Sequence, residues 1–175
     1  TEDVVRALAS HSEKPVVFPL SNPISKSECT AEQAFAWTDG RAVFASGSPF
    51  DDVDLGDGRI GLTSQCNNFY SFPGMGLAVT VLRISRVTDS MFHAAAVRIS
   101  QLAGEEQLRA GRLFPPVEDL RSVSSEVAAS VARIAIEEEL TTADVPDYAL
   151  QSHENMVRFM RTAMWEPEYA TLVAD

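Results

Sequence analysis

Basic residues are scarce in this chain, and so are the features that mark several specialised protein classes. Lysine occurs only twice among 175 residues, and 25 acidic residues against 14 basic ones give a formal net charge of −11. Because affinity for nucleic acids comes mainly from clustered Lys and Arg, this composition argues against a nucleic-acid-binding protein. No apolar run approaches the roughly 20 residues needed to cross a bilayer. We therefore expect neither nucleic acid nor membrane among the partners.

Cysteine is equally rare, which limits metal and redox chemistry. Cys29 and Cys66 are the only two cysteines, they lie far apart in the sequence, and neither has a CxxC partner or a His-rich neighbourhood. This spacing argues against a zinc site or a redox pair. Reduced thiols and the lack of a signal-peptide pattern fit a cytoplasmic location.

Complete catalytic motifs are missing as well. The three histidines, His11, His93 and His153, have no Ser or Cys partner nearby in the sequence. The glycines of residues 74–76 lack the third glycine and the preceding strand of a dinucleotide-binding loop, so entry into a helix is their expected role. The acidic residues in the segment 51–57 lack the later ligands of a calcium loop. The residues themselves therefore predict no complete active site within this chain.

Helices and short apolar strands alternate in the first part of the chain. An N-terminal helix is followed by an apolar run at residues 15–20, which has the form of a strand buried on both faces. Thr30 and Gln33 have the spacing of a capping box, which starts the next helix. A second apolar strand is expected at residues 42–45. This order predicts an α/β fold with a parallel sheet.

Polar residues follow these predicted strands and their neighbour. Asn22 follows the first strand, and residues 46–49 follow the second. Ligands bind outside the carboxyl ends of parallel strands, so both segments are expected near a site. Asn67 and Asn68 lie just before an apolar helix, where paired amides can either cap the helix or hold a carboxylate or hydroxyl group. Spacing alone favours the capping role.

The rest of the chain is predicted to be mainly helical after a small hairpin at residues 51–64. Small residues on one face of a later helix, Ala128, Ala132 and Ala135, should allow close packing against a neighbour. A linker is expected at residues 141–146. Four helices are expected: one from Pro73, one capped at Thr88, one opened by Ser124 or Ser125, and a last one capped by Ser152. The helix after Thr88 has an apolar stripe in which Met91, Phe92 and Ile99 are expected to be core residues. The apolar tail at residues 165–169 is expected to dock on another domain or subunit.

Several long blocks of the sequence resemble the malic enzymes. The blocks are FPLSNP (18–23), ECTAE (28–32), TDGRAVFASGSPF (38–50), QCNNFYSFPGMG (65–76), GRLFPP (111–116) and WEPEY (165–169). They occur in order and span nearly the whole chain. The similarity is strongest to the large-subunit, eukaryote-like branch, of which this chain resembles the C-terminal portion.

The resemblance implies oxidative decarboxylation of malate to pyruvate and carbon dioxide, with NAD or NADP as hydride acceptor and Mg²⁺ or Mn²⁺ as metal. It implies substrate-binding roles for Asn22, Asn67 and Asn68, and cofactor-binding roles for Ser21, Asn22 and Asn67. The family's catalytic tyrosine and lysine, its acidic metal ligands and its glycine-rich loop match no stretch of this chain. We therefore expect no catalytic residue and no metal ligand here, with the metal ligands upstream, and an isolated chain that is inactive.

The same resemblance implies a domain organisation. Residues 1–68 are expected to form the C-terminal part of a Rossmann-like NAD(P)-binding domain, residues 69–140 a helical segment packed on the substrate domain, and residues 141–175 a tail that contacts another subunit of a homo-dimer or homo-tetramer. Two alternatives stay open. One is malolactic chemistry on the same scaffold, and the other is a non-catalytic binding or oligomerisation module derived from it.

Overall fold

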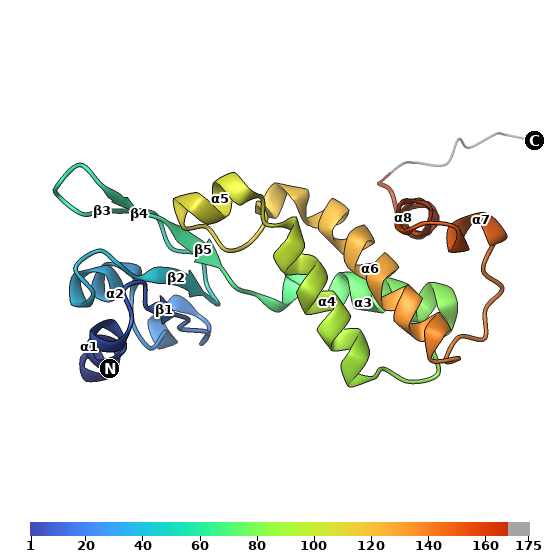
Figure 1. Cartoon of the computed structure of the whole chain (residues 1–175), viewed down its shortest axis with the longest axis horizontal. Helices are drawn as coiled ribbons and strands as arrows, with labels where there is room; N and C mark the ends of the chain where they lie inside the picture. The colour runs from blue at the N-terminus through green and yellow to red at the C-terminus, as the bar shows by residue number, and fades with distance from the viewer. Residues whose placement is uncertain (168–175) are drawn as a thin grey trace, which may run out of the picture.

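The chain folds into two parts that lie end to end along an elongated molecule (Figure 1). The computed structural model describes residues 1–167. The first part contains α1 (Glu2–His11), β1 (Val16–Val17), a 3₁₀ turn (Ile24–Lys26), α2 (Ala31–Trp37), β2 (Val43–Ser46), β3 (Val53–Asp54), β4 (Ile60–Gly61) and β5 (Thr63–Gln65). The second part contains a 3₁₀ turn (Asn68–Tyr70), α3 (Phe72–Leu82), α4 (Asp89–Leu102), α5 (Glu105–Ala110), a 3₁₀ turn (Val117–Asp119), α6 (Leu120–Glu137), α7 (Asp147–Leu150) and α8 (His153–Thr162).

A three-stranded parallel sheet with the order β1-β2-β5 forms the centre of the first part. The predicted parallel α/β arrangement is therefore confirmed. The predicted hairpin is present as the antiparallel pair β3 and β4. However, the prediction missed β5, which follows that hairpin and pairs with β2 through Ala45 and Ser64. Its sequence, Thr-Ser-Gln, has no apolar pattern that would mark a strand.

The first strand is less buried than the sequence predicts. Val17 is buried, but Val16 and Leu20 are 55% and 50% exposed. The reason is the strand order, since β1 pairs only with β2 among residues 1–167 and lies at the edge of the sheet. The expectation of a strand buried on both faces is wrong for this part of the structure.

Phe44 on the central strand organises the core of the first part. Its side chain is fully buried and contacts Phe35 on α2 and Phe50 after β2, with ring centroids 6.2 and 5.7 Å away. The capping box at Thr30 and Gln33 is formed as predicted, and it fixes the start of α2 beneath the sheet.

Arg41 ties the first helix to the start of β2. Its guanidinium donates to the carbonyl groups of Ala9, Ser12 and Glu13 at 3.0–3.2 Å. Carbonyl groups at the end of a helix have no partner within the helix, and the helix dipole is negative there. The Arg41 guanidinium therefore supplies hydrogen-bond donors to these carbonyl groups and a positive charge beside the negative end of the helix dipole.

In the second part, α6 is the central helix, and α3, α4 and α8 pack around it (Figure 1). Ala128, Ala132 and Ala135 are fully buried along it, which confirms that its small residues allow close packing. The helix begins at Leu120, earlier than predicted. Ser124 and Ser125 therefore lie inside it, where their hydroxyl groups donate to the carbonyl oxygens of Leu120 and Ser122 in the same helix.

Two further helix starts were predicted from hydroxyl side chains. Ser152 accepts from the Asn155 N–H at 3.1 Å and caps α8 as expected. Thr88 precedes α4 but makes no capping bond, because its hydroxyl donates to Glu138 at 2.9 Å. It therefore links the start of α4 to the end of α6.

The segment 141–146 connects α6 to the last two helices. Thr141 donates its hydroxyl to the Leu82 carbonyl at 2.6 Å, so the segment is fastened to the end of α3. Beyond α8, Trp165 is 77% exposed, and Glu166 forms an ion pair with Arg121 at 2.5 Å. The rest of the predicted docking tail, Glu168 and Tyr169, lies outside the described residues.

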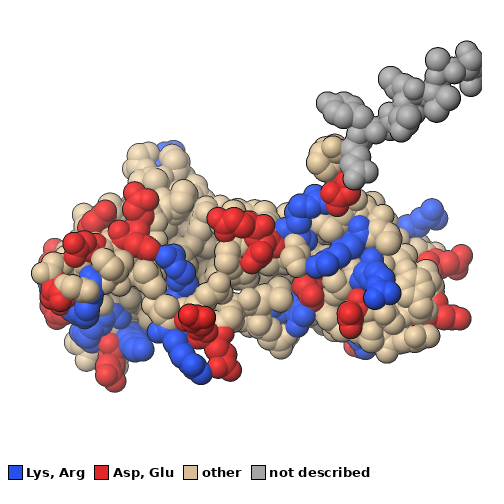
Figure 2. All heavy atoms as spheres, turned by 90° about the horizontal axis from the view of Figure 1, so that it is seen from above, with Lys and Arg blue, Asp and Glu red and all other residues tan. Residues whose placement is uncertain are grey.

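Charges of both signs are mixed along the surface seen in Figure 2. One ion cluster joins three helices. Glu126 on α6 accepts from Arg98 on α4 at 2.5 Å, and the same carboxylate oxygen lies 2.7 Å from the His153 ring on α8. Burial alone would raise the pKa of Glu126, but the hydrogen bonds from His153 and Arg98 outweigh it and lower that pKa.

No helix in residues 1–167 is long and apolar enough to cross a membrane.

Gly74 allows α3 and α6 to approach closely. A Cβ atom there would lie 2.6 Å from the Ser124 carbonyl oxygen and 2.7 Å from the Val127 Cβ, whereas a Cβ at Gly76 in the same helix would meet nothing within 4 Å. We predict that Gly74→Ala lowers the free energy of unfolding by about 1–3 kcal/mol. The matched Gly76→Ala should raise it by up to about 1 kcal/mol, through better helix propensity. Urea unfolding followed by circular dichroism measures both, and equal effects would contradict the close contact.

The Glu126 cluster predicts a specific acid sensitivity. Because the folded pKa of Glu126 lies below its ordinary value of 4.5, its stabilising effect is present above that pH and is lost as the pH falls through the folded pKa. Glu126→Gln should lower the free energy of unfolding at pH 7 by about 1–3 kcal/mol. The difference from the unaltered chain should shrink in acid. Glu106→Gln, an exposed carboxylate on α5, serves as control and should change little.

Candidate functional site

Three loops meet at the carboxyl ends of the parallel strands, and Gly47 lies where they meet. Its N–H donates to the Pro19 carbonyl after β1 at 3.0 Å. Its carbonyl accepts from the Gln65 side chain at 3.2 Å and from Asn67 Nδ2 at 3.0 Å, at the end of β5. A Cβ at position 47 would lie 2.3 Å from the Leu20 carbonyl oxygen. Only glycine permits this approach of the three loops.

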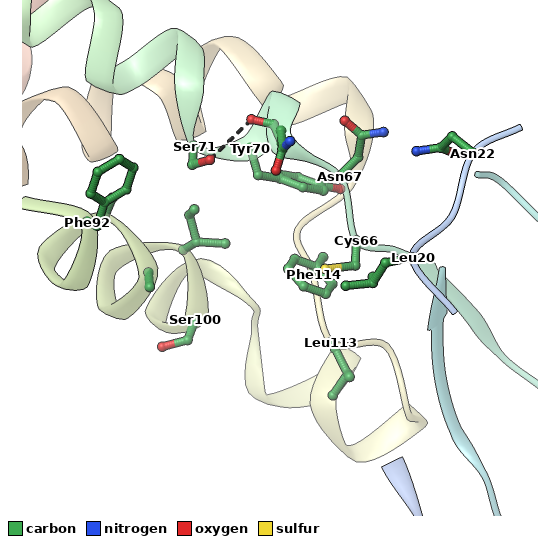
Figure 3. A pocket seen from close by; sticks show the side chains of 14 residues that line it. Leu20, Asn22, Cys66, Asn67, Tyr70, Ser71, Phe92, Ser100, Leu113 and Phe114 are labelled. Carbon is green, nitrogen blue, oxygen red and sulfur yellow. Dashed lines mark hydrogen bonds between the residues drawn. The ribbon is translucent and has the colours of Figure 1, made fainter. Parts of the chain in front are cut away.

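A cavity of about 690 Å³ opens beside this junction, between the strand-end loops and α4 (Figure 3). Its wall combines hydrogen-bonding groups from the loops with apolar groups from the helical part. None of the lining side chains is charged. They belong to Leu20, Asn22, Cys66, Asn67, Asn68, Tyr70, Ser71, Phe92, Ala95, Ala96, Ile99, Ser100, Leu113 and Phe114.

The three asparagines predicted to bind substrate all line this cavity, but their amides are engaged differently. Asn67 is held at both ends, because Nδ2 donates to Gly47 and Oδ1 accepts from the Phe69 N–H at 3.1 Å. Asn22 Oδ1 accepts from the Ser48 hydroxyl. Asn68 is exposed, and its side chain makes no hydrogen bond within residues 1–167. Asn68 and the amide nitrogen of Asn22 are thus the groups most available to a ligand.

The capping role predicted for the two asparagines is only partly present. Asn67 caps the 3₁₀ turn Asn68–Tyr70, whereas α3 begins at Phe72 after Ser71. The prediction that the pair caps the apolar helix is therefore wrong. A three-residue turn intervenes, and it carries the Asn68 side chain away from the end of that helix.

Ser21, predicted to contact the cofactor, does not line this cavity. Its hydroxyl donates to Glu28 Oε1 at 2.6 Å, and its N–H donates to Glu28 Oε2 at 3.3 Å. These bonds lower the pKa of the Glu28 carboxyl group. Ser21 thereby closes the loop that carries Asn22.

The opposite wall comes from α4 and from residues 113–114. Met91 is buried as predicted, but Phe92 is 49% exposed and lies at the cavity, so its predicted place in the core is wrong. The one signal in the sequence for this exposure is that Phe92 directly follows Met91, because consecutive helical residues point in different directions and Met91 belongs to the buried stripe. Cys66 and Phe114 were also missed as site residues, because their places depend on which loops lie opposite one another. Ser48 belongs to the segment 46–49, which was expected near a site.

Contacts from Arg112 and Leu113 join the helical wall to the sheet, whereas Tyr70 stabilises the wall itself. Tyr70 is buried, donates its hydroxyl to the Pro115 carbonyl at 2.6 Å and stacks on Phe114 with ring centroids 5.4 Å apart. Burial raises the pKa of Tyr70 to about 12, so it remains neutral at physiological pH. Arg112 donates to the Thr63 carbonyl at 2.7 Å and pairs with Asp52 at 2.6 Å.

The described residues offer little redox or metal chemistry. Cys29 and Cys66 are free thiols, and burial raises the pKa of both. Residues 1–167 contain no group of three or more His, Cys, Asp or Glu side chains that could hold a metal ion. The site can therefore orient a ligand through neutral amides, but these residues supply no metal ligand set.

A parallel sheet with a ligand-sized cavity at its carboxyl edge places the chain in the class of α/β nucleotide-binding proteins. The family model "Malic enzyme, NAD binding domain" matches residues 1–136. The chain therefore belongs to the malic enzyme family. The predicted α/β fold class and the resemblance noted in the sequence are both confirmed.

Similar proteins are named as malic enzymes of both cofactor types. The chain is 43% identical to an NADP-dependent malic enzyme of Populus trichocarpa over 97% of its length and 27% of the relative's. It is 40% identical to a mitochondrial NAD-dependent malic enzyme of Amaranthus hypochondriacus, over 99% of this chain and 29% of that one. An NADP-dependent malic enzyme of Rattus norvegicus is 38% identical over 100% of this chain and 30% of the relative's length. The chain thus spans less than a third of these relatives.

A solved structure shares the fold. The malic enzyme of Pyrococcus horikoshii superposes with a TM-score of 0.61 at 21% identity, over 94% of this chain and 33% of that one. At this identity the likeness concerns the fold alone.

The junction at Gly47 can be tested directly. Gly47→Ala should lower the free energy of unfolding by about 1–3 kcal/mol, because the new Cβ displaces the Leu20 backbone from its place 2.3 Å away. Denaturant unfolding of this chain measures the change, with Gly76→Ala as a control for the same substitution at an open position. A Gly47→Ala chain as stable as the unaltered one would show that the loops are not held at this point.

Proposed function

We propose that this chain is part of a malic enzyme that converts malate to pyruvate and carbon dioxide, with reduction of NAD or NADP. Membership of the family and the names of the relatives support the reaction class. The observation that carries the proposal for this chain is the meeting of Asn22, Asn67 and Asn68, from two separate segments, at one uncharged cavity.

The three amides take different parts in this proposal. Asn68 and Asn22 hydrogen-bond the carboxylate and hydroxyl oxygens of malate, since their amide groups are the ones available at the cavity. Asn67 holds the β5 loop in place through Gly47 and touches the ligands with its remaining N–H. Orientation of this kind lowers the entropic part of the barrier.

The cofactor proposal concerns Ser21, Asn22 and Asn67. The cavity lies at the edge of the sheet where α/β domains bind dinucleotides, and amide groups suit the carboxamide of a nicotinamide ring. Asn22 and Asn67 would hold that group directly, and Ser21 would fix the loop through Glu28. The bound cofactor would accept the hydride from C2 of malate.

A divalent metal does not fit the described residues, which contain no cluster of three potential ligands. We therefore propose that Mg²⁺ or Mn²⁺ is bound by other parts of the full-length protein, and that the isolated chain is inactive. The neutral cavity supports this division, because a doubly charged substrate needs positive charge nearby.

The domain boundaries and the assembly are proposals too. Separate cores on either side of residue 68 support the boundary between residues 1–68 and 69–140, although the second core continues into α7 and α8 as far as Met160. The exposed Trp165 supports a role of residues 141–175 in contacts of a homo-dimer or homo-tetramer. Two free, half-buried or buried thiols fit a cytoplasmic location.

The substrate role of the amides leads to a kinetic prediction. In the full-length protein, Asn68→Ala and Asn22→Ala should each lower kcat/KM for malate about 10–100-fold, the effect of a lost hydrogen bond to a charged group. Asn155→Ala removes an amide on α8, remote from the cavity, and should leave kcat/KM within about twofold. Absorbance of the reduced cofactor and assay of pyruvate measure the reaction.

The same assay separates the alternatives. Lactate formed without net reduction of the cofactor would identify malolactic chemistry. Malate binding without turnover would identify a non-catalytic module. Unchanged kinetics in both Asn variants, in an enzyme that does form pyruvate, would overturn the site assignment while leaving the reaction class intact.

A further inference from the structure

Ser48 contacts the Asn22 side chain at the edge of the cavity. It lies two residues after β2, is only 6% exposed, and donates its hydroxyl to Asn22 Oδ1. Asn22 itself lies on an exposed loop, where an amide would otherwise rotate freely. The buried hydroxyl of Ser48 thus restrains the exposed Asn22 amide through this hydrogen bond.

We infer that Ser48 is a positioning residue that sets which end of the Asn22 amide faces the ligand. An asparagine amide has an acceptor oxygen and a donor nitrogen of nearly the same shape, so packing alone does not distinguish its two orientations. The contact of Ser48 Oγ with Oδ1 distinguishes them here, because the amide oxygen can only accept and the hydroxyl must therefore donate. With Oδ1 bound to Ser48, Nδ2 is left as the free end, and Figure 3 shows this nitrogen directed toward Asn67.

The backbone around Ser48 is shaped for this contact. The hydroxyl of Ser46, fully buried on β2, donates to the Ser48 carbonyl at 2.6 Å and fixes the turn. The absent side chain of Gly47 leaves room for Asn22 Nδ2, which lies 2.9 Å from where a Cβ would be. Residues 46–48 therefore form the surface at the end of β2 against which the Asn22 amide packs.

The chemical consequence is a preference for ligands that accept hydrogen bonds. The Asn22 nitrogen facing the cavity donates a hydrogen bond to a carboxylate or carbonyl oxygen of a ligand. In the opposite orientation Asn22 Oδ1 would face that ligand oxygen, and neither acceptor would have a donor. Ser48 thus selects an oxygen-acceptor ligand without touching it. This inference rests on the proposed function, in which Asn22 binds malate.

A double-mutant cycle in the full-length enzyme tests the inference. If Ser48 acts only through Asn22, Ser48→Ala should lower kcat/KM for malate about tenfold, as expected for loss of one hydrogen bond. In an Asn22→Ala background the same change should have an effect below about twofold. Ser48→Thr keeps the hydroxyl and should recover most of the activity. A purely structural role would give equal losses in both backgrounds, which would overturn the inference.

Controls separate folding, orientation and the function itself. Ser124→Ala removes a similarly buried hydroxyl that bonds within α6, and it should leave kcat/KM unchanged. Thermal unfolding is recorded for every variant. If Ser48→Ala does not fold, Ser48→Cys replaces it with the same expectations, because a thiol is a weak donor of similar size. Full activity in Asn22→Ala would refute the proposed role of Asn22, whereas a defective Asn22→Ala beside a fully active Ser48→Ala would refute the inference alone.

Discussion

The close approach of three strand-end loops at Gly47 is the constraint on which the site depends. The N–H of Gly47 donates to the Pro19 carbonyl, and its carbonyl oxygen accepts from the Gln65 and Asn67 side chains. Such sharing is possible only where no Cβ separates the neighbouring backbones. The amides of Asn22 and Asn67 come from distant parts of the sequence, yet their relative position is set by this residue. Side chains on loops can therefore be placed with the precision that binding requires.

The second wall of the cavity depends on different forces. The sheet and the helices have separate hydrophobic cores, so no continuous apolar packing fixes one part to the other. Arg112 and Leu113 supply polar connections, the first to Thr63 and Asp52 and the second from its N–H to the Ser64 hydroxyl oxygen on β5. A few polar contacts thus determine the width of the cavity.

The sequence predicted those features that depend on local patterns. The capping box at Thr30, the strand around Phe44 and the small residues of α6 all act through neighbours in the chain or through one helix face. The strand β5 was missed because its residues are polar and its pairing with β2 is long-range. Ser124 was misread as a helix start because a hydroxyl that bonds inside a helix looks the same in sequence as one that caps it. The three asparagines named from the sequence line one cavity, and their role in binding stays a prediction. The contacts that support them depend on loop packing that no local pattern encodes.

The proposed function requires a strongly acidic chain to bind an acidic substrate, and the neutrality of the cavity makes this possible. The chain carries a net charge of −11, but no charged side chain from residues 1–167 lines the cavity. Amide nitrogens can direct a carboxylate without balancing its charge, and an added Lys or Arg would compete with a metal ion for the same oxygen atoms. In the proposed enzyme, orientation therefore comes from this chain and charge compensation from the remainder of the protein. Under this proposal the amides alone leave the negative charge of the carboxylate uncompensated, so the cost of removing it from water must be offset by charges elsewhere in the protein.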